Sequence, residues 1–392
     1  MGKHSLAIFK RTLLSLLVAC VTLFTVYGQQ IPKAQEHYDR GLELAKEGKF
    51  HDATEQFTQA IAINPEFNDA YYQLGLSALG DNRPQDAIHA FMQLSQLQPA
   101  NSKPVLAAAQ LYYGLGFLDD ALALSVRALL IEPKNASIYF NIGLIYLKQK
   151  HPPQAIDALE HAISLDPTIK KARLLLATAY TDSGKPDGAI RTLQDGIRLN
   201  PESPDLMVSL GEAYVVAGRL PEAEAEFRST ISGNKDYIPA HIGLATVYRR
   251  QHQFPKAIAE LTQILVAEPK AYNALLERGI SFYESGDREA ARRDLDAFLQ
   301  AVPGRPEGFY YLGLIDLDQE HYESAVTNLR KMLDLSPDSC DGQTHLAKAY
   351  MLLGKLDAAE QSMTGCLGMT PPDKSASQLS EEIEKRRAGA PK

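Results

Sequence analysis

Apolar and polar residues follow each other along this chain with the period of an amphipathic α-helix, and the pattern returns every 34 residues. In the stretch 137–167, apolar residues recur at steps of three and four and are interrupted by one short turn. They are Ile142, Ile145, Tyr146, Ala155, Ile156, Leu159, Ala162 and Ile163. This spacing predicts two amphipathic helices joined by a turn. The chain is therefore predicted to be a series of helical hairpins.

Four columns of residues keep the same 34-residue phase. The first holds Ala53, Ala87, Ala121, Ala155, Ala189, Ala223, Ala257, Ala291, Ala325 and Ala359. The second holds Gly41, Gly75, Ala109, Gly143, Ala177, Gly211, Ala245, Gly279, Gly313 and Ala347. The aromatic column holds Tyr112, Tyr146, Tyr180, Tyr214, Tyr248, Phe282 and Tyr350, and the proline column Pro65, Pro99, Pro133, Pro167, Pro201, Pro269, Pro303, Pro337 and Pro371. Small residues at facing positions let two helices approach closely, and the aromatic ring fills the space beside them.

These columns resemble the tetratricopeptide repeat family in their period, their small slots, their aromatic slot and their closing proline. The resemblance covers residues 34–373 as ten repeats without an insertion, with residues such as His37 and Tyr71 in place of the family's leading Trp. It implies an all-α, right-handed superhelical solenoid of about ten helix-turn-helix repeats. Because no single repeat can bury its apolar face alone, stability is expected to be collective.

The N-terminal segment carries a targeting pattern. Residues 1–11 contain three basic residues and no acid, and residues 12–26 are apolar. This predicts a signal peptide over residues 1–28, and export to the periplasm or cell envelope. Two alternatives stay open, both of which tether the chain to a membrane. One is lipidation of Cys20, since Leu17–Ala19 before it resembles a lipoprotein processing box, and the other is an uncleaved anchor.

The C-terminal segment is predicted to cover the last repeat. Residues 375–387 have the spacing of a short capping helix with a capping box that begins at Ser375, and residues 388–392 are predicted to be a disordered tail. Cys340 and Cys366 lie near the start and the end of the predicted last hairpin, whose antiparallel helices would bring them together. Either a disulfide or two buried, inert thiols would fit.

The net charge and the absence of catalytic motifs argue against several classes of function. The net charge is −8, and loss of residues 1–28 would remove three basic residues and no acid, which makes it −11. Nucleic acid is therefore an unfavourable partner. The histidines form no pair one helical turn apart, and phosphate-binding loops, nucleophile elbows and Cys-x-x-Cys motifs are absent from the sequence. We predict no catalytic residue, no metal ligand, no cofactor and no enzymatic activity.

In the family that the chain resembles, the first helix of each repeat lines a concave groove that holds a peptide or a helix. Projection of the first helices gives two apolar stretches, in repeats one to four and in repeats eight and nine. The predicted groove residues are Tyr38, Tyr72, Leu76, Tyr113, Phe140, Leu144, Leu276, Tyr283, Tyr310 and Leu314. Between them the same slots are polar, as at Glu212, Thr246 and Arg249. Alternatively, some of the apolar residues only pack between repeats.

The sequence thus predicts a non-catalytic scaffold of the cell envelope that binds a protein or peptide through its concave groove. One alternative is a passive envelope spacer or a lipoprotein-type assembly subunit. A more distant one is a substrate-delivery module of an enzyme complex.

Overall fold

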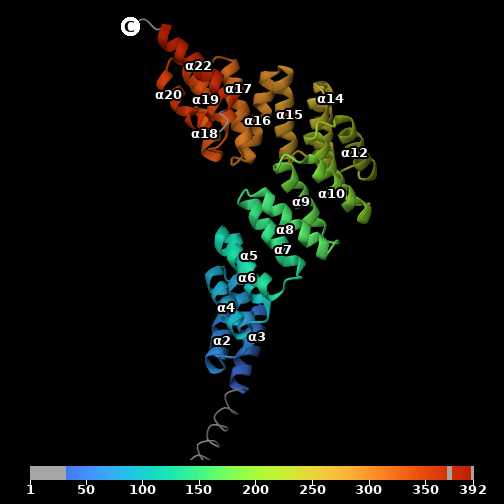
Figure 1. The fold of residues 1–392 in the computed structure, drawn as a ribbon, viewed down its shortest axis with the longest axis vertical. Helices are drawn as coiled ribbons and strands as arrows, with labels where there is room; N and C mark the ends of the chain where they lie inside the picture. The colour runs from blue at the N-terminus through green and yellow to red at the C-terminus, as the bar shows by residue number, and fades with distance from the viewer. Residues whose placement is uncertain (1–31, 369–372, 390–392) are drawn as a thin grey trace, which may run out of the picture. The chain divides into compact units, whose positions relative to one another are not determined.

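The computed structural model describes residues 32–368 and 373–389, and every regular element within these ranges is a helix. The all-α repeat fold predicted from the sequence is confirmed. The predicted signal peptide, Cys20 and residues 390–392 lie outside the described residues. The described residues divide into two compact units, one that ends at residue 192 and one that begins at residue 193. Figure 1 labels helices of both units.

The boundary between the units falls inside a helix, where the sequence had indicated one uninterrupted domain. In the first unit, a helix that includes residues 32–46 precedes α2 (Phe50–Ile63), α3 (Asn68–Gly80), α4 (Pro84–Leu97), α5 (Ser102–Leu115), α6 (Leu118–Ile131), α7 (Ala136–Lys148), α8 (Pro152–Leu165), α9 (Lys170–Asp182) and the start of α10 (Pro186–Leu199). Each repeat in such an array contacts only its neighbours. Two units of the array can therefore adjoin within a helix, without a linker between them.

The second unit continues the same alternation. It holds the end of α10, α11 (Pro204–Val216), α12 (Leu220–Gly233), α13 (Ile238–Arg250), α14 (Phe254–Ala267), α15 (Tyr272–Ser285), α16 (Arg288–Ala301), α17 (Pro306–Asp318), α18 (Tyr322–Leu335), α19 (Cys340–Leu352), α20 (Leu356–Ser362), α21 (Thr364–Leu367) and α22 (Lys374–Gly389). In this unit the first helices α11, α13, α15, α17 and α19 each pack on their own second helix, and each contacts the next first helix in the series. Successive first helices therefore share one surface.

The turn inside each repeat has one backbone conformation throughout. Ten residues spaced by 34 positions have a positive φ, and six of them are glycine. The other four are Asn82, Lys150, His252 and Glu320, with φ between 57° and 62°. A left-handed residue at this point ends the first helix, and only glycine adopts that conformation without a steric cost.

The alanine column forms the centre of the core, because all ten alanines have no exposed surface. The Gly/Ala column packs against the residue 16 positions later. An added Cβ on Gly41, Gly75 or Gly211 would lie within 2.7 Å of Phe57, Phe91 or Phe227, respectively. Where the column holds alanine, the residue 16 positions later is Ser125, Leu193, Leu261 or Met363, and leucine also follows Gly143, Gly279 and Gly313. Phenylalanine therefore occurs at this position only where the Gly/Ala column holds glycine.

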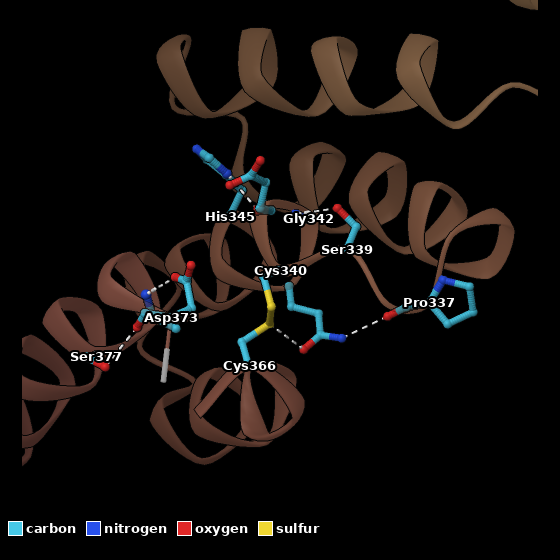
Figure 2. Close-up of a disulfide and its surroundings, with 11 residues drawn as sticks. Pro337, Ser339, Cys340, Gly342, His345, Cys366, Asp373 and Ser377 are labelled. Carbon is cyan, nitrogen blue, oxygen red and sulfur yellow. Dashed lines mark hydrogen bonds between the residues drawn. A yellow bond between two sulfur atoms is a disulfide. The ribbon is translucent and has the colours of Figure 1, made fainter. Parts of the chain in front are cut away.

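The last repeat departs from the regular pattern. Its second helix is interrupted at Met363 and continues as α21, and a disulfide joins Cys340 at the start of α19 to Cys366 in α21, with the two Cα atoms 5.5 Å apart (Figure 2). The structure therefore has the disulfide, one of the two arrangements that the cysteine positions allowed.

Helix α22 covers this last hairpin. Ala376 and Ile383 are fully buried in the core cluster of repeats nine and ten, and Arg387 binds Asp357 of α20 at 2.5 Å. The cap is Asp373, whose carboxylate accepts a hydrogen bond from the Ala376 amide at 2.9 Å, and not the predicted Ser375, which lies inside the helix. The helix also extends to residue 389, so residues 388 and 389 are helical and do not belong to a tail.

Candidate functional site

The most promising site is a cavity of about 780 Å³ in the second unit. Three successive first helices line it, together with Phe227 of α12 and the turns before α15 and α17. The lining residues are Glu212, Val215, Val216, Phe227, Ile238, Pro239, Ile242, Gly243, Thr246, Glu268, Lys270, Ala271, Tyr272, Asn273, Leu276, Glu277, Val302 and Arg305. Its size is in the range of cavities that hold small molecules or peptide side chains.

Besides pairs at the 34-residue period of the repeats, the lining contains rows of residues that are spaced by 30 residues. Glu212 of α11, Ile242 of α13 and Tyr272 of α15 form one such row, and Val216, Thr246 and Leu276 form another. Each successive helix thus contributes a residue about one helical turn earlier than the last. As a result, the cavity combines side chains from different positions of the repeat.

Gly243 shapes the wall of the cavity on α13. The fully buried ring of Phe227 lies between Gly211 and Gly243, and an added Cβ on Gly243 would be 2.3 Å from that ring. A larger residue there would force the ring to move. Because residue 243 has no side chain, the edge of Phe227 reaches the cavity lining.

Glu212 contributes a carboxylate that has no partner. Within the described part of the chain it makes no ion pair and no hydrogen bond, and burial raises the pKa of its carboxyl group above the ordinary 4.5. The side chain is also accessible to solvent. Both observations fit a concave position, where water reaches the group but protein replaces much of the bulk solvent around it.

Glu277 contributes a second carboxylate, which shares one cation with Glu284. Arg249, whose side chain is 13% exposed, places Nη1 2.6 Å from Glu284 Oε1 and Nη2 3.4 Å from Glu277 Oε2. The Oε2 atom of Glu277 is buried and accepts no hydrogen bond. Burial raises the pKa of Glu277, and the neighbouring Arg249 only partly opposes this. The site therefore holds more negative than positive charge.

The groove residues predicted in the first unit occupy two kinds of environment. Tyr72 and Leu76 on α3 are 45% and 40% exposed and could meet a partner directly. Tyr38 instead packs its ring 4.8 Å from that of Phe67. Tyr113, Phe140 and Leu144 are also partly buried, with the Lys148 ammonium 4.8 Å from the ring centre of Tyr113 and Phe140 packed on a core cluster.

In the second unit, only one predicted groove residue lines the cavity. Leu276 is 5% exposed and lies in its wall. Tyr283 lies under the Arg288 guanidinium, 4.2 Å from its ring centre, while Tyr310 and Leu314 pack against the core cluster of the last repeats. Burial raises the pKa values of Tyr283 and Tyr310 to about 12, so both phenols keep their protons at neutral pH.

Sequence reasoning missed most of the apolar wall and described this part of the surface as polar. Val215, Val216, Ile238, Ile242 and Tyr272 all line the cavity beside Glu212 and Thr246. Projection at the 34-residue period compared equivalent positions and so separated residues that the 30-residue step brings together. One signal was available, because Gly243 occupies a slot that holds Ser209 and Glu277 in the neighbouring repeats.

Metal-binding clusters and membrane-spanning helices are both absent from the described residues. No three His, Cys, Asp or Glu side chains there come together as a metal site. No helix in the same ranges combines the length and the apolar character that crossing a bilayer requires.

Comparisons with known protein families agree with the architecture. Four family models, each described as "Tetratricopeptide repeat", match residues 38–102 and 106–168, 146–206 and 181–232, 244–308, and 342–373. The chain is 27% identical over 129 residues to the protein O-mannosyl-transferase Tmtc3 of Drosophila melanogaster, and this covers 33% of the chain and 14% of Tmtc3. It is 31% identical over 65 residues to an uncharacterized protein of Methanocaldococcus jannaschii, covering 17% of the chain and 76% of that protein. The chain thus spans about one seventh of the length of Tmtc3.

Solved structures show the same fold. A tetratricopeptide repeat protein from Parabacteroides merdae aligns with a TM-score of 0.57 and 18% identity, covering 64% of this chain and 98% of its own. The structure of the APC/C hetero-tetramer Cut9–Hcn1 aligns with a TM-score of 0.52 and 16% identity, covering 89% of this chain and 76% of its own. At these identities the likeness concerns the fold alone.

Proposed function

The chain belongs to the tetratricopeptide repeat family, and on that premise we propose that it is a non-catalytic scaffold that binds a segment of another protein on the shared surface of its first helices. The observation that carries this proposal is the cavity formed by α11, α13 and α15. Its wall combines apolar side chains with a few polar groups, which is the composition typical of binding pockets. Exposed Tyr72 and Leu76 on α3 would add a second contact region in the first unit.

Site-specific photo-crosslinking tests the proposal. A photoreactive phenylalanine analogue would replace Tyr272 in the cavity and, separately, Tyr72 on α3. The control position is Gln300, an exposed residue on the second helix α16 of the same unit. We expect discrete adducts from Tyr272 and Tyr72 in cells that produce the full chain, and none from Gln300.

Mass spectrometry would identify the partner, and the purified partner segment should compete for the same crosslink. If position 272 gives no adduct that Gln300 does not also give, binding at the cavity is refuted. The passive spacer would then account better for the chain.

We further propose that the chain is exported by residues 1–28. The basic start and the apolar run of this segment support the proposal. The disulfide between Cys340 and Cys366 also supports it, since disulfides persist in oxidising compartments.

Fusion of residues 1–28 to alkaline phosphatase, which is active only after export, tests this step. Active phosphatase is expected, and an inactive fusion would refute export. A Cys20→Ala variant of the fusion separates the routes, because ordinary cleavage should continue without Cys20 and lipidation should not.

A further inference from the structure

The charges of the cavity are unevenly distributed. Its helices contribute two carboxylates, Glu212 and Glu277, and no basic residue. Its turns contribute Glu268, Lys270 and Arg305. Arg305 is paired with Glu307 at 3.1 Å, and Glu268 and Lys270 are exposed, oppositely charged and two residues apart. The turns therefore add little net charge, and the helical wall is negative.

The nearest buried cation does not neutralise this wall. Arg249 does not line the cavity, and its guanidinium already contacts both Glu277 and Glu284. Glu212 has no cation at all within the described residues. A charged group in a partly desolvated position is costly unless it is paired. The cavity therefore favours a positive charge beside Glu212.

The apolar wall limits the form that this charge can take. Val215 of α11, Ile242 of α13 and Leu276 of α15 all line the cavity that holds the carboxylates. Lysine and arginine side chains combine a long aliphatic stem with a cationic end, so one side chain can contact both surfaces. An apolar side chain would cover the wall but leave the Glu212 carboxylate unpaired, and an acidic side chain would be repelled.

From this arrangement we propose that the cavity selects a peptide by a basic side chain, lysine or arginine, whose aliphatic stem lies along the apolar wall and whose charge pairs with Glu212 and Glu277. This inference rests on the proposed function and specifies the peptide that the cavity accepts. Glu212 is the main determinant, because Arg249 already satisfies part of the charge of Glu277.

The experiment selects ligands without prior assumption. The full chain is used to select peptides from a random library displayed on phage, and each selected peptide is then labelled with fluorescein and tested for binding by anisotropy. A second form of each peptide carries norleucine, which keeps the aliphatic stem but lacks the charge, in place of its basic residue. Crosslinking from position 272 identifies the peptides that occupy the cavity.

We expect the peptides in the cavity to share a lysine or arginine. Its replacement by norleucine should weaken binding to the wild-type chain about tenfold or more, which is the scale of a charge-assisted hydrogen bond. Glu212→Gln should remove most of this difference, and Glu277→Gln part of it. Glu289→Gln removes one exposed carboxylate of α16 outside the cavity and should leave the difference unchanged.

Circular dichroism would verify that each variant is folded, and Glu212→Gln should fold well because it removes an unpaired carboxylate. If peptides crosslink at position 272 without preference for a basic residue, or if Glu212→Gln leaves the norleucine difference intact, the inference is wrong and the proposed function stands. If no peptide crosslinks there, both are overturned.

Discussion

The close contact between Gly211 and Phe227 makes Gly211→Ala a sharp test of the packing between α11 and α12. An added Cβ would lie 2.6 Å from the ring of Phe227, well inside ordinary carbon contact. The ring is fully buried and has Gly243 on its other side, where an added Cβ would be only 2.3 Å away, so it has little room to retreat. Overpacking costs about 1–3 kcal/mol, and the confined ring places Gly211→Ala in the upper part of this range, at about 2–3 kcal/mol. Alanine regains about 1 kcal/mol of helix propensity. We expect a net loss of about 1–2 kcal/mol.

Urea unfolding followed by far-ultraviolet circular dichroism measures this loss, since the chain has no Trp for fluorescence. The control is Gly114→Ala in α5, where an added Cβ meets nothing within 4 Å. This control should be neutral or stabilising by up to about 1 kcal/mol. Hydrogen exchange of α11 and α12 would locate the effect, because unfolding of a repeat array need not be two-state.

The close contact between Gly211 and Phe227 also predicts a rescue. Gly211→Ala combined with Phe227→Leu gives the two residues that occupy the same positions in the next repeat, Ala245 and Leu261. The double variant should therefore be more stable than the sum of the two single effects by about 1–2 kcal/mol. Single effects that add within about 0.5 kcal/mol would refute the proposed contact. A Gly211→Ala variant as stable as the wild type would refute it as well.

Three further outcomes are expected. The Cys340–Cys366 disulfide joins two residues that are 26 positions apart in the sequence, and its reduction should destabilise the last hairpin by about 3 kcal/mol. Identical thermal melting with and without a phosphine reductant would contradict this. Arg249→Ala leaves two carboxylates unpaired and should lower the free energy of unfolding in urea by about 2–4 kcal/mol. The control Arg250→Ala removes an exposed side chain and should cost less than about 0.5 kcal/mol. Equal losses in the two variants would refute the buried pairing. Because burial raises the pKa of Glu212, its ionisation opposes folding as the pH rises above 4.5, so Glu212→Gln should gain stability over the wild type at about pH 7 and not at about pH 4. The same difference at both pH values would show that the carboxyl group is not buried enough to matter.

The sequence by itself determined the repeat, its register and its core. Ten alanines spaced by 34 residues are buried without exception, and the Gly/Ala column faces larger residues 16 positions later. The closeness of Cys340 and Cys366 was also foreseeable, because an antiparallel hairpin brings its two open ends together, but the sequence left both a disulfide and two free thiols open. These features depend on contacts within a repeat or between adjacent repeats, so local periodicity contains the information that specifies them.

Only the tertiary structure decided where a ligand could bind. The stagger between successive first helices places Glu212, Ile242 and Tyr272 in one row, although the 34-residue period assigns them to different positions. The same stagger put Leu276 in a cavity wall, while the packing of neighbouring helices partly buried Tyr310. The N-cap residue of α22 was also decided only by the tertiary structure. Asp373 and Ser375 both have side chains that can cap a helix, but the helix begins at Lys374, so Asp373 is the cap and Ser375 lies inside the helix. Sequence periodicity gives each residue its place in a repeat, but the surface depends on the rotation and offset between helices, which are set by how side chains of different repeats pack together.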